Sequence, residues 1–279
     1  MGAMKPDQPY NKNIPIKLRS MEVSFYRGST TLTPIIYVAT LDANFSIGKK
    51  NSLQVKLPYQ MIQGRLANTS GVGDISLCFT RNIYSSEKFD VSVSVGSKIP
   101  TNKSDKTEND RPLPKYYQTS LGTYDAIAGI SLVNRKWLFA TGIQVPLNKN
   151  NNEFLWGRWA GSDEDPKYIE KYARANQLKR GIDVMVRVER NFRFSRLNLS
   201  VGLLPIYRVT NDEIELPEGT VKPEGAKGLA MSGIGTIGYS FNVKSGIKLL
   251  VGHKIIQRDE NPDGLTRELV TSLTYIYRF

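Results

Sequence analysis

The chain has 279 residues, enough for two ordinary domains, but no linker-like change of composition divides it, and β-barrels of this length commonly form one domain. No run approaches the roughly 18 apolar residues of a membrane-spanning helix, which leaves a membrane barrel open because half of each barrel strand faces a polar lumen. A formal charge of +12 commonly indicates nucleic-acid binding, but here it is spread along the chain rather than gathered on one helix or tail, so an anionic membrane surface is an equally good partner.

The N-terminal residues 1–15 are polar, rich in proline and without periodicity. We expect them to form a tail or a plug that enters a lumen, ahead of a single barrel domain over residues 16–279. The first four residues, MGAM, show neither a basic nor an apolar export region. We interpret them as a replacement for a signal peptide that has been removed.

Apolar and polar residues alternate with a period of two after residue 15, which is typical of β-strands with two different faces. The first strands, in chain order, are expected at residues 20–26, 35–45, 53–61, 74–80 and 89–98. A charged loop over residues 100–120 follows the fifth strand. The polar face of the hairpin over residues 74–98 carries small residues together with charges, whereas a solvated surface more often carries long Lys and Glu side chains.

The second half of the chain continues the same pattern. Further strands are expected at residues 124–132, 137–147, 182–189, 196–203, 229–241 and 247–256, with a turn at Asn191 and the longest loop over residues 148–176. With the closing strand this makes about twelve strands, and short turns alternate strictly with longer loops. Soluble sandwiches have no reason to separate the two kinds of connection, whereas membrane barrels keep turns periplasmic and loops extracellular.

The last strand, residues 269–279, reads LVTSLTYIYRF and ends on Phe279. One face is apolar and increasingly aromatic, as in the girdle at a bilayer interface, although this strand alone would also fit the edge of a soluble sandwich. The whole pattern predicts an all-β protein, a transmembrane antiparallel barrel of about twelve strands in the bacterial outer membrane.

Charged residues on the polar face are the candidates for lining the lumen, and acids and bases among them are about balanced. The candidate pore-lining residues are Asp42, Lys56, Asp74, Asp90, Lys98, Asp125, Asp183, Arg187, Glu189, Arg196, Arg208, Lys248 and Lys254. One interpretation is structural pairing, because an unpaired buried charge is costly. The other places a basic strip from the second half of the chain opposite acidic residues from the first half, which predicts a mild anion preference.

Catalysis, cofactors and metals find little support in the sequence. The only histidine, His253, shares an apolar face and is not followed by the His-x-Ser pattern of an outer-membrane phospholipase. The triplet Asp163-Glu164-Asp165 has calcium-ligand chemistry, but an ordinary solvated loop is the favoured explanation. We therefore expect no enzyme, no cofactor and no metal site.

Three strings between Leu53 and Thr101 resemble a known family. LQVKLPYQ at residues 53–60, SGVGDISLCFTRNI at 70–83 and VSVGSKIPTN at 93–102 are similar to the outer-membrane proteins associated with the phenol meta-cleavage degradation pathway. The resemblance implies a barrel that moves small, often aromatic or hydrophobic molecules. It covers about fifty residues well and the rest only through strand rhythm and the terminal Phe279.

Two functions remain open at this point. The first is a channel or transporter for small solutes, either hydrophobic by resemblance or anionic by lumen charge. The second is a non-conducting barrel that anchors or recruits partners through its long loops. Lipid bilayer and lipid phosphates, including lipopolysaccharide, are the expected partners, and a monomer is favoured. The sequence does not decide whether the lumen is open or plugged.

Overall fold

The computed structural model describes residues 16–30 and 32–279, so the prediction for residues 1–15 lies outside the described residues. Twelve strands form one closed antiparallel barrel, and a short thirteenth strand extends it beside the third. The strands are β1 (Ile16–Ser29), β2 (Ile35–Ile47), β3 (Asn51–Gln63), β4 (Asn68–Val72), β5 (Ile75–Ser85), β6 (Asp90–Ile99), β9 (Asp125–Val133), β10 (Trp137–Pro146), β11 (Asp183–Phe194), β12 (Leu197–Arg208), β15 (Gly228–Ser240), β16 (Ser245–Ile256) and β17 (Leu269–Arg278).

Each barrel strand pairs with its neighbours in sequence, and the ring closes between the first and the last strand. β1 runs antiparallel to β17, in a register that places Ser29 opposite Leu269 and Ser20 opposite Arg278. The backbone N–H of Phe279 donates to Arg19 O at 3.0 Å, so pairing continues to the last residue. The predicted fold class is therefore confirmed.

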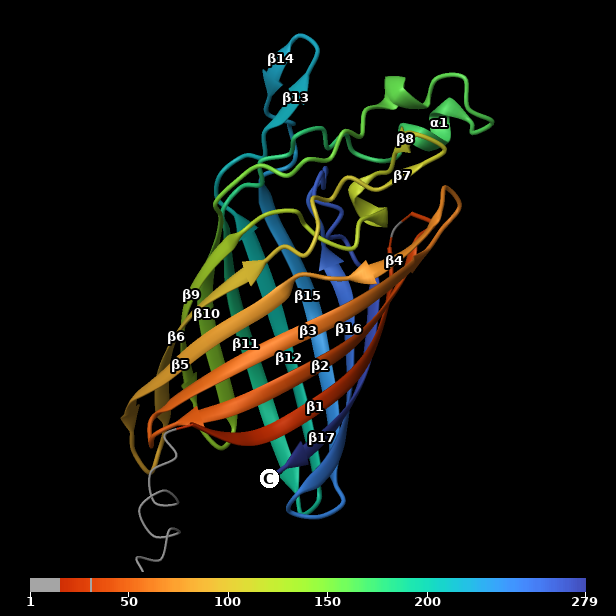
Figure 1. Ribbon diagram of the computed structural model, residues 1–279. Coiled ribbons are helices and arrows are strands. Elements are labelled where there is room, and N and C mark those ends of the chain that lie inside the picture. The colour runs from red at the N-terminus through yellow and green to blue at the C-terminus, as the bar shows by residue number, and fades with distance from the viewer. Residues whose placement is uncertain (1–15, 31) are drawn as a thin grey trace, which may run out of the picture.

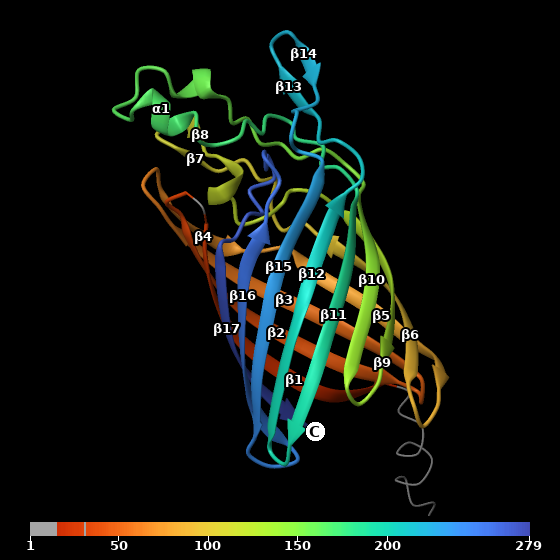
Figure 2. The ribbon, with the colours of Figure 1, turned by 180° about the vertical axis from the view of Figure 1, so that it is seen from behind.

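The connections segregate by length (Figures 1 and 2). Turns over residues 48–50, 86–89, 134–136, 195–196 and 241–244 share one end of the barrel, here called the turn end, which also holds the C-terminus. Longer connections gather at the opposite end, the loop end. At the first turn, Gly48 has φ +65°, a conformation that glycine adopts at no steric cost.

The predicted turn at Asn191 is wrong. β11 continues to Phe194 because Asn191 pairs with Ser200 in the ladder, and its N–H donates to Lys136 O at 2.6 Å. The chain reverses only at Ser195, whose φ is +42°. Asparagine favours turns, and here pairing with β12 and the hydrogen bond to the β9–β10 turn outweigh that local preference.

The outer surface of the barrel is apolar. Large side chains such as Phe25, Leu203 and Leu273 lie at alternate positions of their strands and are exposed, so no other part of the described chain covers them. An apolar band of this extent is stable in contact with lipid, and closure of the barrel satisfies the strand edges that hydrocarbon could not. Within the described residues, no helix has the length and apolar character that crossing a membrane requires.

The buried hydrophobic core lies among the loops rather than inside the barrel. It joins loop residues such as Leu113, Phe154 and Tyr172 to the loop-end parts of β2 and β3 at Ile36 and Ile62. Short elements order these loops: β7 (Thr107–Glu108), β8 (Arg111–Pro112), η1 (Lys115–Tyr117), η2 (Trp156–Trp159), α1 (Pro166–Ile169), β13 (Ile214–Leu216) and β14 (Gly219–Val221). The loop end is therefore a packed cap, from which the β13–β14 hairpin projects (Figure 1).

Candidate functional site in the lumen

Two loop segments enter the mouth of the barrel, and together they are called the plug: residues 113–123, which contain η1, and residues 257–268. The backbone of Gly264 lies against η1 so closely that an added Cβ would be 2.8 Å from Tyr116 N. Gly264 also has φ +65°, so both its conformation and its contact require glycine. The Tyr116 and Thr266 hydroxyls share a hydrogen bond of 2.8 Å. The two segments therefore interlock.

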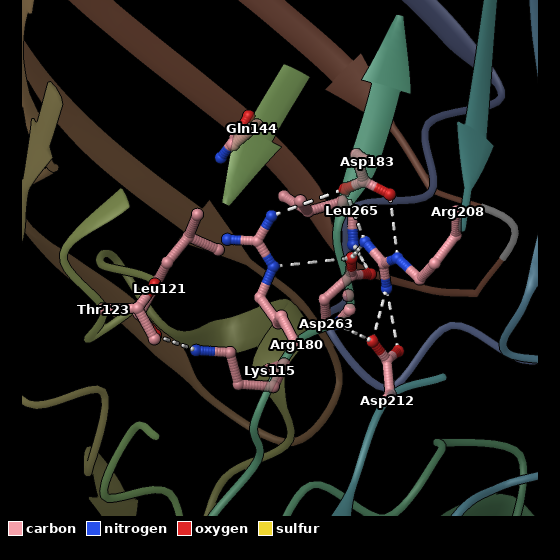
Figure 3. Close-up of polar contacts among 12 residues, drawn as sticks. Lys115, Leu121, Thr123, Gln144, Arg180, Asp183, Arg208, Asp212, Asp263 and Leu265 are labelled. Atoms are coloured by element: carbon pink, nitrogen blue, oxygen red, sulfur yellow. Dashed lines mark hydrogen bonds and ion pairs between the residues drawn. The ribbon is translucent and has the colours of Figure 1, made fainter. Parts of the chain in front are cut away.

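Arg208, at the loop end of β12, anchors the plug to the barrel wall (Figure 3). Its guanidinium donates to Asp183 at 2.8 and 2.7 Å, to Asp212 at 2.9 and 2.8 Å, and to Asp263 of the plug at 2.7 Å. The side chain of Arg208 is only 1% exposed. Charge-assisted bonds of this kind are strong in a water-poor site, and here one arginine joins two strands and two loops.

Arg180 ties the loop between β10 and β11 to the opposite side of the cluster. Its Nη1 donates at 3.0 Å to Asp125, which also accepts from Thr123 at 2.8 Å and from the Gln144 amide. Its Nη2 lies 3.6 Å from Asp183 (Figure 3). The segment that leads into β11 is thus held by the same ionic cluster as the plug.

The electrostatics of the cluster favour a charged Asp263. Burial alone would raise the pKa of this carboxyl, but the guanidiniums of Arg208, Arg258 and Arg180 outweigh burial and hold its pKa below the usual range. Asp212 behaves oppositely, because its burial raises its pKa and Arg208 offsets this effect only in part.

Lys115 of η1 is the buried cation of the plug. Its ammonium donates to Ser104 Oγ, to Leu121 O at 3.0 Å and to Ser120 O at 3.3 Å. Burial, followed by repulsion from Arg180, lowers the pKa of Lys115 to about 7. The adjoining strand end is secured separately, because Asp74 accepts from the Ser120 hydroxyl and from Leu121 N–H.

Three cavities lie in the lumen beneath the plug, and all of them reach Arg267. The first, of about 330 Å³, lies between β11, β12, β15 and β16 and the 257–268 segment. The second, of about 410 Å³, lies between β1, β2, β3, β16 and β17. The third, of about 240 Å³, lies under η1 against β2, β3, β5 and β6. Arg267 lines each of them, so it stands where the lumen divides.

The wall below is formed largely by small polar residues. Ser76 and Lys98 line the third cavity and lie opposite each other in the ladder, so the alternating Thr80 and Ser94 face the same way. Those two hydroxyls share a hydrogen bond of 2.7 Å. Small side chains leave a barrel of this size space for solvent.

The structure places most of the candidate pore-lining residues on the lumen side. Those that line the cavities are Asp42, Lys56, Asp74, Lys98, Asp183, Arg187, Arg208, Lys248 and Lys254. Asp125 and Glu189 are buried as ion-pair partners of Arg180 and Arg187. Passage of a solute beside any of them stays a prediction.

Two candidates lie elsewhere. Arg196 is exposed in the two-residue turn between β11 and β12, because β11 extends further than expected and moves the reversal onto it. Asp90 is exposed at the turn end of β6, where it accepts from the Ser85 hydroxyl. Neither residue lines one of the three cavities beneath the plug.

The separation into an acidic and a basic wall is also corrected. Asp42 pairs with Lys56 at 3.3 Å on the neighbouring strand, and Arg187 pairs with Glu189 of its own strand. Opposite charges therefore meet locally instead of facing one another across the lumen. Lys248 and Lys254 have no carboxylate within ion-pair distance among the described residues, and they are what remains of the basic strip.

Several residues of the site were not identified from the sequence. They come from loops and include Lys115, Arg180, Asp212, Asp263 and Arg267. Strand periodicity gives no information on loop side chains, and Asp263-Gly264 reads as an ordinary turn. The one available signal was the presence of charges flanking strand ends.

The other singled-out residues lie outside the lumen. His253 is exposed and pairs in register with Leu269 on the lipid-facing side. Glu164 pairs with Arg65 at 2.8 Å, and Asp165 caps α1 by accepting from Lys167 N. Among the described residues, no group of three or more His, Cys, Asp or Glu is arranged to hold a metal ion.

Comparison with solved structures places the chain among outer-membrane barrels. It matches the COG4313 outer membrane channel from Pseudomonas putida F1 at 14% identity and a TM-score of 0.65, over 98% of this chain and 99% of that one. It also matches the NanC porin at 10% identity and a TM-score of 0.50, over 94% of this chain and 100% of that one. No protein-family model and no curated protein matches the chain. The outer-membrane barrel fold is confirmed, whereas the phenol-degradation family is not.

The expectation that the chain is not an enzyme requires correction. The outer membrane phospholipase A from Escherichia coli is among the matched barrels, at 8% identity and a TM-score of 0.43 over 92% of each chain. Neither the barrel nor a lone histidine excludes catalysis. The match does not show that this chain has an activity.

Proposed function

We propose that this protein is a bacterial outer-membrane channel for small solutes, with its loop end outside the cell and closed by the plug. The observation that carries the proposal is the position of the cavities, directly beneath an interlocked plug inside a barrel whose outer surface is apolar. A barrel that serves only as an anchor does not require charge-lined cavities of this size in its lumen. The matches to a channel and a porin support the proposal at this coarse level.

The solute is small, because the plug and Arg267 divide the lumen into spaces of a few hundred Å³. The cavity under residues 257–268 has mainly apolar walls, which supports a solute with an apolar part. Lys248 and Lys254 support the mild anion preference. Arg196 does not contribute to it, because this residue is exposed at the turn end.

Single-channel recording in planar bilayers tests the proposal. We expect small, anion-favouring conductance steps with long closed periods imposed by the plug. Lys248→Ser should shift the reversal potential toward cations in a salt gradient, whereas Arg196→Ser should leave it in place. Electrical silence of a correctly folded barrel under all voltages and salts would overturn the channel.

Silence of that kind would favour the second candidate, a non-conducting barrel that binds partners through its cap. Two observations support it: the plug fills the mouth, and the β13–β14 hairpin projects beyond the cap (Figure 2). A pull-down with the hairpin tip intact and deleted would then be the informative experiment.

The partners we propose for the outer surface are membrane lipids, with the barrel as a monomer. A basic groove at the turn end is lined by Arg135, Lys136, Arg190 and Arg193, with Arg190 stacked 4.8 Å from the Trp137 ring centroid. Interfacial aromatics and cations are suited to phospholipid phosphate. Changing Arg135 and Lys136 to Glu should reduce the anionic phospholipid that copurifies, as measured by mass spectrometry.

A further inference from the structure

The first lumen cavity combines apolar walls with cations that have no ionic partner. Its apolar residues are Leu204, Ile206, Ala230, Ile234, Leu250, Ile256, Leu265 and Val270. The volume of about 330 Å³ falls at the lower end of the range for small-molecule sites. The cavity is therefore large enough for a compact organic molecule.

Leu265 is the most informative of these side chains. It belongs to the plug, where its neighbours Gly264 and Thr266 are buried, yet Leu265 itself is 44% exposed. It borders both the first and the third cavity. An apolar side chain that a loop exposes to the lumen gains from an apolar molecule that covers it.

The charges around the cavity are not all available to a ligand. Arg208 uses its whole guanidinium on Asp183, Asp212 and Asp263, and Arg187 is paired with Glu189. These groups are neutralised within the protein.

Lys254 and Arg267 differ from them. The Lys254 ammonium donates to the Gln257 amide oxygen at 2.6 Å, and Arg267 donates to the carbonyls of Gly264 and Thr266 at 2.8 and 3.0 Å. Neither has a carboxylate within ion-pair distance among the described residues. Lys254 N–H donates to Glu268 O at 3.0 Å, so the backbones that carry the two cations are adjacent.

We propose that this cavity binds a small amphipathic anion, a monocarboxylate whose head group lies between Lys254 and Arg267 and whose apolar body lies against Ile206, Ile234, Leu250 and Leu265. The inference rests on the proposed channel function and specifies its solute. A carboxylate supplies the charge that both cations lack, and the apolar body covers Leu265. Neither a simple inorganic anion nor a neutral hydrocarbon satisfies both parts of the cavity.

Isothermal titration calorimetry on the full chain in detergent tests the inference with four probes. Benzoate and hexanoate carry both an anionic and an apolar part, acetate carries only the anion, and benzyl alcohol carries only the ring. We expect benzoate and hexanoate to bind at least about tenfold more tightly than acetate and benzyl alcohol, because a hydrogen bond to a charged group and apolar burial each contribute.

Variants assign the binding to this cavity. Lys254→Gln should weaken benzoate about tenfold, and Leu265→Asn should weaken benzoate and hexanoate by a similar factor. Lys49→Gln, at the turn between β2 and β3, should leave both unchanged. If Lys254→Gln does not give a folded, heat-modifiable barrel, Arg267→Gln tests the head-group site in its place.

Each contrary result is distinct. Equal binding of acetate and benzoate would reduce the site to general anion attraction, and equal binding of benzyl alcohol would remove the charge from recognition. Unchanged affinity in the Lys254 and Arg267 variants would place binding elsewhere. Absence of binding in a protein that still conducts would overturn this inference alone, whereas electrical silence would overturn the channel itself.

Discussion

The ion pair between Arg208 and Asp263 holds a loop inside the mouth of the barrel. Asp263 accepts from Arg208 at 2.7 Å and lies 3.6 Å from Arg258, and it is fully buried. Replacing Asp263 removes a hydrogen bond between charged groups, which contributes about 1.5 to 3 kcal/mol, while Asp183 and Asp212 still neutralise Arg208. The cost here falls on the docking of the plug rather than on the strand ladder.

Asp263→Asn should therefore release the 257–268 segment. We expect faster amide hydrogen exchange in that segment and a larger open fraction in single-channel records, with the barrel still closed. Asp259→Asn, on an exposed residue of the same loop, is the matched control. Equal exchange rates in the two variants would show that the ion cluster does not hold the plug.

The lowered pKa of Lys115 predicts a pH dependence of stability. The unfolded chain keeps this lysine protonated up to its ordinary pKa of 10.5, whereas the folded chain releases the proton near pH 7. The unfolded state thus binds more protons between these values, so the free energy of unfolding of the plug should rise as pH increases from about 7 and should be flat below it.

Protease resistance of the plug, measured from pH 6 to pH 9, checks this expectation. Lys115→Met should abolish the slope because it removes the titrating group, whereas Lys103→Met, at an exposed position of the same loop, should retain it. A slope that persists in Lys115→Met would assign the pH dependence to another group.

At the scale of the elements, each strand separates lipid from lumen by simple alternation. Val95 lies near the middle of β6 and is exposed on the outer face, whereas Ser92 of the same strand faces the lumen. Val95→Arg should reduce insertion, because a cation near mid-bilayer costs about 2 to 4 kcal/mol. Ser92→Arg introduces the same side chain on the polar face and should insert normally. Heat-modifiable migration after membrane extraction measures both, and equal yields would reverse the assignment of the two faces.

Asp183 shows that a lumen position is not automatically a tolerant one. Alternation places it on the polar face, where polar substitution is expected to be accepted. The structure shows two hydrogen bonds from Arg208 to Asp183, so its replacement would unbalance a buried cluster. Whether a position in this barrel accepts substitution therefore depends on the ion pairs of its side chain as well as on the face of the strand that it occupies.

At the scale of the whole molecule, the barrel and its cap are stabilised by different interactions. The barrel depends on a closed backbone ladder and a lipid-facing surface, whereas the cap depends on a buried aromatic core. Tyr172 is at its centre, where it shares hydrogen bonds with Tyr168 at 2.9 Å and with Tyr117 at 3.2 Å. The plug connects the two parts.

This separation predicts that the plug can be shortened without loss of the barrel. Replacing residues 258–266 by a short Gly-Ser linker should raise single-channel conductance severalfold, since Asp183 and Asp212 still neutralise Arg208. Shortening the β13–β14 tip over residues 215–220 is the control and should leave conductance unchanged, because that hairpin projects away from the lumen (Figure 1). Unchanged conductance in the first variant would mean that the plug does not limit flow.

The sequence by itself determined the barrel. Alternation, strand number, the separation of turns from loops and the aromatic closing strand are all properties of short segments, since a strand with one face in lipid and one in water must alternate wherever it lies. The ring then follows from pairing neighbours and joining β1 to β17.

Only the tertiary structure decided the site. Arg208 meets Asp263 and Arg180 meets Asp125 across 55 residues of sequence each, and Arg267 borders three cavities that different strands enclose. Loop residues have no periodic constraint, so their positions depend on distant contacts that a local pattern cannot encode. Arg196 illustrates the same limit. The location of its side chain depends on where β11 and β12 stop pairing, and β11 is longer than the sequence pattern predicts.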